Sequence, residues 1–212
     1  IAAGRGWGTG TSFALTADGA LWGWGANMSG ELGIGTLIDR TTPVLIGTAY
    51  AAVAPGGTHT VAIKTDGSLW TWGANHEGQL GTGTADNFVV PRPVKIGDGY
   101  RTASANNRHS LAIKTDGSLW AWGANEYGQL GDGTKISRFV PVKIGTGFAD
   151  VVAGELNSFG IKTDGSLWAW GSNGTWALGD GTNVDRLEAV QIGTGYSAVS
   201  SNSGRSVALK TD

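Results

Sequence analysis

The sequence predicts an all-β protein built from one repeated unit. The segment Asp-Gly-(Ser/Ala)-Leu-Trp-x-Trp-Gly begins at Asp18, Asp66, Asp116 and Asp164, at intervals of 48, 50 and 48 residues. Each copy follows a run that roughly alternates apolar with small or polar residues, which is the pattern of a half-buried strand. The 37 glycines recur in register with this period, so they indicate turns rather than disorder. A period near 50 residues is typical of a propeller, a solenoid or another array.

The unit at residues 100–147 shows the expected order of strands. Residues 102–105 are a short run of small residues, and residues 110–115 are the first half of a hairpin. Asp116 and Gly117 follow, and such a two-residue connection predicts a turn in which both residues have positive φ. Residues 118–123 are the partner strand, on which Trp120 and Trp122 share one face because they lie two positions apart.

A glycine-rich loop and a last strand complete each unit. Gly128, Gly131 and Gly133 specify a tight loop rather than a helix, and residues 140–145 form a strand with Pro141 near its start. We therefore expect four short antiparallel strands per unit. Residues 1–212 are expected to form a single repeat domain, with units at about 1–49, 50–99, 100–147 and 148–195 and a partial unit at 196–212.

Two roles are open for the tryptophan pairs of the repeat. The pairs are Trp22 and Trp24, Trp70 and Trp72, Trp120 and Trp122, and Trp168 and Trp170. Exposed rings would make sugar-stacking platforms, whereas rings packed between neighbouring sheets would bury roughly 150–250 Å² each. The same pair recurs beside every predicted turn, and this regularity favours the packing role.

The repeated aspartates and two histidines are candidates for chemistry. Asp18, Asp66, Asp116 and Asp164 each precede a glycine in a predicted turn, and the turn explains them better than a catalytic or calcium-binding series. His59 and His109 hold a position that carries Thr, Asn or Arg in other units, which favours local hydrogen bonding over catalysis. No nucleophile elbow, histidine pair or acidic calcium loop is present. We therefore predict no enzyme activity, no metal and no cofactor.

Composition restricts the partners. Fifteen basic and 17 acidic residues give a net charge of −2, so we expect no nucleic acid partner. No apolar run approaches the roughly 20 residues of a membrane span, so we expect no membrane insertion.

The chain has no cysteine, which excludes disulfides and thiol chemistry. Its start at Ile1 without a signal-like segment favours a processed product or an excised piece.

The run from Trp120 to Thr134 closely resembles the repeat of the regulator of chromosome condensation family. The run from Trp70 to Thr84 does so too, and the His-led strand at His109 matches as well. The resemblance spans essentially the whole chain and implies a β-propeller of four-stranded antiparallel blades, usually seven. The form Asp-Gly-Ser-Leu-Trp-Ala-Trp-Gly is similar to bacterial members of the family, which implies an extracellular or cell-surface location.

The number of repeats does not close a ring of that size. Seven blades at this period need roughly 350 residues. We therefore expect an arc of four blades plus an overlapping half repeat. An open arc leaves an apolar flank and an unpaired strand edge. We expect further repeats of the same polypeptide, or self-association, to cover them.

Variable loops indicate where a partner binds. The units differ most before the His position and after the Asn of Trp-Gly-x-Asn, as repeat proteins do on a binding face. The candidate interaction residues are Arg5, Trp7, Asn106, Arg108, Tyr127, Glu155 and Trp176. Trp176 also replaces the loop glycine of the other units, so positive φ at this position would strain or reshape the turn.

These observations favour a non-catalytic protein-interaction scaffold that binds an unidentified protein partner. A carbohydrate-binding propeller is the first alternative, and burial of the tryptophan pairs would count against it. Guanine-nucleotide exchange on a small GTPase is the second, and it rests on the family resemblance alone. The exchange and chromatin-binding members act in a eukaryotic nucleus on acidic partners, and this chain carries no basic tail.

Overall fold

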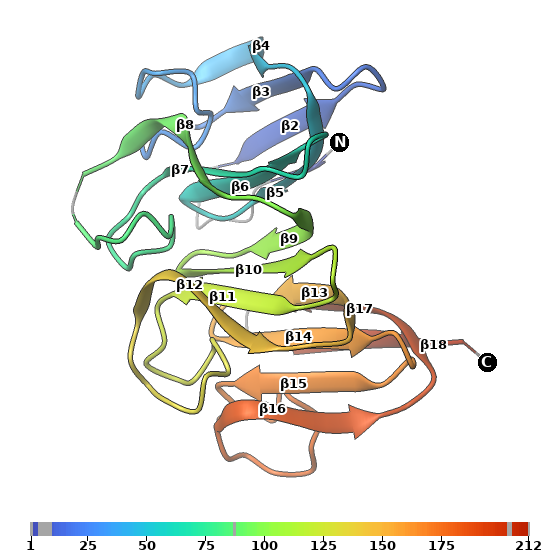
Figure 1. Cartoon of the computed structure of the whole chain (residues 1–212). Helices are drawn as coiled ribbons and strands as arrows, with labels where there is room; N and C mark the ends of the chain where they lie inside the picture. The colour runs from blue at the N-terminus through green and yellow to red at the C-terminus, as the bar shows by residue number, and fades with distance from the viewer. Residues whose placement is uncertain (1, 4–9, 87, 203–204, 212) are drawn as a thin grey trace.

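The computed structural model describes residues 2–3, 10–86, 88–202 and 205–211, and this part of the chain contains strands and no helix. The strands form four sheets of four strands and one of two strands, with every pairing antiparallel (Figure 1). The first sheet comprises β1 (Ala2–Ala3), β2 (Thr11–Leu15), β3 (Leu21–Gly25) and β4 (Arg40–Gly47). The second comprises β5 (Tyr50–Pro55), β6 (His59–Lys64), β7 (Leu69–Gly73) and β8 (Val90–Gly97).

The same order repeats in the rest of the chain. The third sheet comprises β9 (Tyr100–Ala105), β10 (His109–Lys114), β11 (Leu119–Gly123) and β12 (Arg138–Gly145). The fourth comprises β13 (Phe148–Ala153), β14 (Asn157–Lys162), β15 (Leu167–Gly171) and β16 (Arg186–Gly193), and the fifth has only β17 (Tyr196–Asn202) and β18 (Arg205–Lys210).

The sheets are the blades of a partial propeller. Within each blade the strands pair in chain order, and the first strands of successive blades contact one another. The blades follow one another from the top to the bottom of Figure 1 as an open arc. The predicted fold class, all-β with four-stranded antiparallel blades, is therefore confirmed.

The predicted two-residue turn was wrong in its geometry. In the third sheet Gly117 N donates to Lys114 O and Lys114 N donates to Ser118 O, both at 2.9 Å, so the connection has three residues, Thr115–Gly117. Gly117 has φ of 77°, whereas Asp116 is not among the residues with positive φ. The Asp116 carboxylate instead accepts the Ser118 N–H at 2.9 Å and the Ser118 hydroxyl at 2.6 Å. A three-residue turn with one left-handed glycine thus joins the strands.

The core forms clusters between neighbouring blades, and one fully buried tryptophan anchors each of three of them. Trp72, Trp122 and Trp170 have no exposed surface. The Trp122 indole Nε1 donates to the carbonyl of Gln79 in the preceding blade at 2.8 Å, and Trp72 and Trp170 make the equivalent bonds to Glu31 and Gln129. The other tryptophans of the pairs, Trp22, Trp24, Trp70, Trp120 and Trp168, are partly exposed.

Candidate protein-interaction face

Two sets of loops meet at one end of the blades. One set joins the first and second strands (residues 56–58, 106–108 and 154–156), and the other joins the third and fourth strands (residues 26–39, 74–86 with 88–89, 124–137 and 172–185). Ala124 N donates to Arg108 O at 2.9 Å, and Ala74 and Ser172 make the equivalent bonds. We call this end of the molecule, at the left of Figure 1, the loop face.

One buried asparagine organises each long loop. The Asn125 amide Nδ2 donates to the carbonyls of Thr134 and Ile136 at 3.0 and 3.1 Å, and its Oδ1 accepts the Leu130 N–H at 2.9 Å. Asn27, Asn75 and Asn173 hold the same place, and all four are at most 1% exposed. Sequence reasoning used this asparagine as a landmark and gave it no role, although its presence in all four units was the available signal.

An ion pair fixes two of the loops further. Arg138 Nε contacts Asp132 at 2.7 Å, and Arg186 Nε contacts Asp180 at 2.6 Å. Burial favours a higher pKa for the Asp180 carboxyl, but hydrogen bonds from Thr182, Arg186 and Asn173 outweigh it and lower the pKa to about 2. Burial likewise favours a higher pKa for the Asp132 carboxyl, but hydrogen bonds from Thr134 and Arg138 outweigh it and lower the pKa. Both aspartates therefore stay charged at neutral pH, and each ion pair cross-links its loop.

Among the candidate interaction residues, Asn106 is buried, so its side chain does not reach the surface where a partner would bind. It is only 6% exposed, and its amide donates to the Ala153 carbonyl of the next blade at 3.3 Å. Sequence reasoning placed it on a loop tip, but its side chain reaches inward across the blade interface. Arg5 and Trp7 lie outside the described residues.

The remaining candidates are accessible to different extents. Arg108 is partly exposed and joins two loops, with Nε 3.1 Å from Glu77 Oε1 and Nη2 2.8 Å from Glu126 Oε1. Glu155 is partly exposed, Tyr127 is 37% exposed and Trp176 is 68% exposed. Trp176 has φ of 57°, so it adopts the left-handed conformation of the glycine that it replaces.

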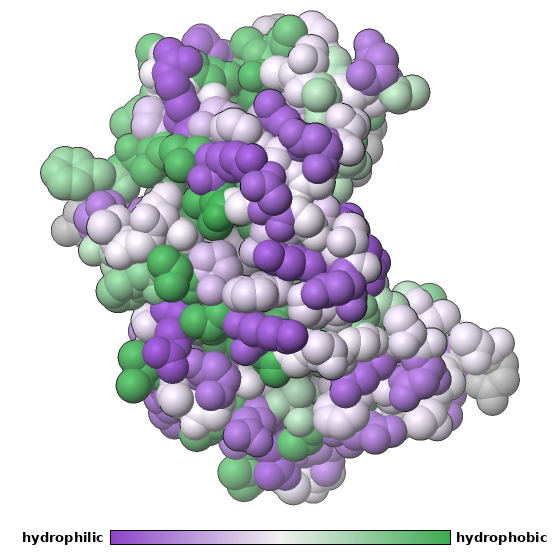
Figure 2. All heavy atoms as spheres, in the orientation of Figure 1, coloured by the Kyte–Doolittle hydropathy of each residue, from purple (hydrophilic) through white to green (hydrophobic). Residues whose placement is uncertain are grey.

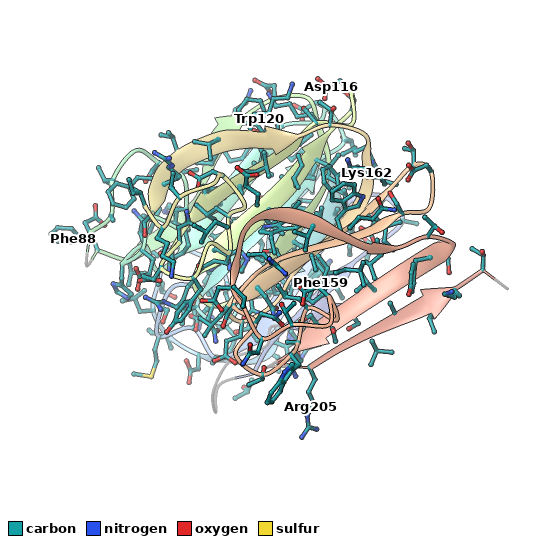
Figure 3. The ribbon with its side chains drawn as sticks, turned by 90° about the horizontal axis from the view of Figure 1, so that it is seen from below. Phe88, Asp116, Trp120, Phe159, Lys162 and Arg205 are labelled. Atoms are coloured by element: carbon teal, nitrogen blue, oxygen red, sulfur yellow. The ribbon has the colours of Figure 1, made fainter. Side chains whose placement is uncertain are left out.

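Sequence reasoning missed a row of apolar side chains on the same face. Ile38, Ile136 and Val184 are 63%, 62% and 56% exposed, and Phe88 in the second blade is 78% exposed. We call these four residues the loop ridge; apolar atoms gather at the left of Figure 2, and Phe88 projects from the ribbon in Figure 3. The organising asparagines bind the carbonyls of Ile38, Ile136 and Val184. Each of these backbones is therefore held against the loop while its side chain faces solvent.

The two buried histidines are structural. His109 Nε2 lies 2.9 Å from Ser158 Oγ, a distance that a base and a nucleophile would also show, but the Ser158 hydroxyl donates to the Gln129 carbonyl at 2.8 Å. The Nε2 of His109 is therefore the donor to Ser158. Burial lowers the pKa of His109, and likewise of His59, to about 3. With no exposed surface on either ring, the pairs cannot reach a substrate.

In the described ranges, no group of three or more His, Asp or Glu side chains is placed to hold a metal ion. Those residues also include no helix long and apolar enough to cross a membrane. The loop face itself presents exposed apolar side chains beside short ionic networks.

Comparison with known families accounts for the repeat. The model described as the regulator of chromosome condensation (RCC1) repeat matches residues 18–63, 66–113 and 116–160. A second model with the same description matches residues 50–79, 101–129 and 148–174. The chain belongs to the RCC1 repeat family. Among curated proteins, the Ultraviolet-B receptor UVR8 of Arabidopsis thaliana is 38% identical over 56 residues, which cover 24% of this chain and 13% of UVR8.

Three solved structures share the fold. Human WBSCR16 superposes with a TM-score of 0.86 at 22% identity over all of this chain and 58% of its own. Yeast RCC1 (Prp20), in its structure with Kap60, gives 0.83 at 23% identity over all of this chain and 54% of its own. A further Prp20p structure, from Saccharomyces cerevisiae, gives 0.80 at 23% identity over 95% of this chain and 54% of its own. The chain thus spans little more than half the length of these structures.

Proposed function

We propose that the chain is a non-catalytic protein-interaction module that binds a protein partner through the loop face. The observation that carries the proposal is the loop ridge, whose four side chains are each more than half exposed. Large apolar side chains exposed together on a rigid support are typical of protein-binding surfaces. Trp176 and Tyr127 on the same face add the aromatic type that dominates binding energy at interfaces.

The similarity to Prp20 supports a protein partner. Prp20p binds Gsp1p and histones, and yeast RCC1 (Prp20) forms a complex with Kap60. The carbohydrate-binding alternative is weaker, because the second tryptophan of three pairs is fully buried and its indole N–H is bonded to a carbonyl. Location outside the cell stays an expectation from the resemblance, which fractionation of the source cells would test.

The proposal is tested by replacing the loop ridge. A variant with Ile38→Asp, Phe88→Asp, Ile136→Asp and Val184→Asp should keep its fold, because these side chains are more than half exposed. It should lose at least tenfold in affinity for the partner found by affinity capture and then purified. The matched control is Leu45→Asp with Val94→Asp, two residues 46% and 38% exposed on β4 and β8, outside the loop face. Equal binding by the ridge variant and the wild type would refute the proposal.

A further inference from the structure

A cavity of about 340 Å³ lies between the third and fourth blades, and this volume is typical of small-molecule sites. Its lining comes from β12 and the loop before it, and from all four strands of the fourth blade. None of the four residues of the loop ridge lines it. An inference about this cavity therefore goes beyond the proposed function.

Two ammonium groups line the cavity. Lys162, which Figure 3 labels, has its Nζ 4.0 Å from the centre of the Trp168 ring and 5.3 Å from that of the Phe148 ring. Two aromatic rings thus hold this cation in place. Lys143 on β12 is exposed. Neither lysine forms an ion pair with any residue that the structure describes, so both charges are available to an anion.

The equivalent of Lys143 in the second blade has a partner. Lys95 occupies the same register position on β8, and its Nζ lies 2.7 Å from Asp98 Oδ1. In the third blade Thr146 stands where Asp98 stands in the second. The third blade therefore keeps the cation and lacks the carboxylate that would neutralise it.

Two smaller residues leave the space open at this interface. Between the second and third blades the Tyr100 hydroxyl lies 3.8 Å from the place that a Cβ atom on Gly97 would take. Phe148 holds the position of Tyr100 in the fourth blade and has no hydroxyl. Ala189 on β16 stands where Pro141 stands on β12. Both replacements remove atoms from the cavity wall, and Phe148 and Ala189 both line the cavity.

One free acceptor and an apolar wall complete the lining. Glu188 on β16 is exposed, and its carboxylate forms no ion pair within the described ranges. Asp132 also lines the cavity, but Arg138 Nε holds it at 2.7 Å. Ile144 and Phe148 supply apolar surface. Two free cations, one free acceptor and this wall are complementary to a carboxylate, a hydrogen-bond donor and a short carbon skeleton.

From these features we infer that the cavity binds a small organic carboxylate that also carries hydrogen-bond donors, as sugar acids and amino acids do. Its carboxylate meets Lys143 and Lys162, since hydrogen bonds between charged groups are the strong ones. Its hydroxyl or ammonium group donates to Glu188. Its carbon skeleton lies against Ile144 and Phe148.

The probes are sodium D-glucuronate and sodium L-glutamate, which share the carboxylate and differ in the donor. Isothermal titration calorimetry of the folded chain at low ionic strength should show saturable one-to-one binding. D-glucose, the neutral counterpart of glucuronate, should bind at least tenfold more weakly. Binding of glucuronate alone would identify a sugar acid, and binding of glutamate alone would identify an amino acid. Failure of both probes to bind, or equal binding of glucose and glucuronate, would overturn the inference.

A substitution on the third blade tests the role of the free lysine. Thr146→Asp gives Lys143 the partner that Asp98 gives Lys95, so binding of the carboxylate probe should weaken at least fivefold. The matched control is Lys95→Gln, which removes a lysine in the same register outside the cavity and should leave binding unchanged. Equal affinity of the Thr146→Asp variant and the wild type would contradict the inference.

A second pair of variants tests the space in the cavity. Phe148→Tyr adds the hydroxyl that Tyr100 carries, so the fold should persist while the cavity narrows and binding weakens at least fivefold. Tyr100→Phe is the reverse change at the neighbouring interface and should leave binding unchanged. Circular dichroism checks that both variants fold. Equal losses of binding in the two variants would place the ligand outside this cavity and refute the inference.

Discussion

The two buried histidines make the stability of the folded blades depend on pH. His59 and His109 each bond a serine of the following blade, with Nε2 to Oγ distances of 2.8 and 2.9 Å. Burial lowers the pKa of both rings to about 3, and the ordinary value is 6.5. Since the unfolded chain takes up these protons first as the pH falls below 6.5, acid favours unfolding, and this loss of stability is complete below about pH 3.

We therefore predict that replacing both histidines by glutamine reduces the loss of stability on acidification. Each histidine should cost the wild type about 2 kcal/mol between pH 7 and pH 5, since one pH unit below the unfolded pKa corresponds to about 1.4 kcal/mol. Urea unfolding at pH 7, 6 and 5 measures this difference. Carboxylates such as Asp180, whose pKa is lowered to about 2, contribute only at lower pH. A variant that loses as much stability as the wild type would contradict the prediction.

The backbone conformation of Trp176 lowers the stability of the fold, while its exposed side chain is available for binding. Its left-handed φ of 57° costs of order 1–2 kcal/mol for a residue with a Cβ. Trp176→Gly should therefore raise the free energy of unfolding by up to about 1 kcal/mol, after the entropy of glycine is subtracted, and should weaken partner binding. Urea unfolding gives the first effect and a binding isotherm gives the second. Lower stability with unchanged binding would show that the tryptophan has a packing role instead.

At the scale of single elements, the long loop depends on its asparagine. Asn125 has no exposed surface, and Asn125→Ala removes the donor to two partly buried carbonyls and the acceptor of the buried Leu130 N–H. Unpaired buried polar groups cost about 1–3 kcal/mol each, so we expect a loss of about 2–4 kcal/mol after partial relaxation. Chemical unfolding measures it, with exposed Asn183→Ala as the control. A loss no larger than that of the control would disprove the organising role.

The strands, turns and loops also show which structural features could be predicted from the sequence and which could not. The order of the strands and the Trp-x-Trp strand were predictable, because alternating side chains specify a strand and regularly spaced glycines specify turns within a few residues of sequence. The turn geometry was wrong, because the Asp116 carboxylate bonds Ser118 and the turn takes one residue more than expected. Asn106 was misplaced, because its partner is a carbonyl 47 residues away in the next blade. The loop ridge was missed, because three of its side chains are exposed by asparagine bonds that hold the backbone of Ile38, Ile136 and Val184 against the loop.

At the scale of the whole molecule, the blades form a row in which each stabilises its neighbours. Stability in such arrays is a sum of unit terms and interface terms, so the blade with the fewest strands and one neighbour should open first. Val207 and Leu209 on β18 are 67% and 61% exposed, whereas Leu111 and Ile113, which hold the equivalent positions on β10, have no exposed surface. The fifth sheet therefore has the smallest apolar burial to hold it closed.

Hydrogen exchange should show this gradient directly. We predict that backbone amides of β17 and β18 exchange at least a hundredfold faster than those of β10 and β14, because sub-global opening of the end sheet does not require the central blades to unfold. Mass spectrometry of peptic fragments measures the difference. Uniform protection along the chain would mean that the five sheets open as one cooperative unit.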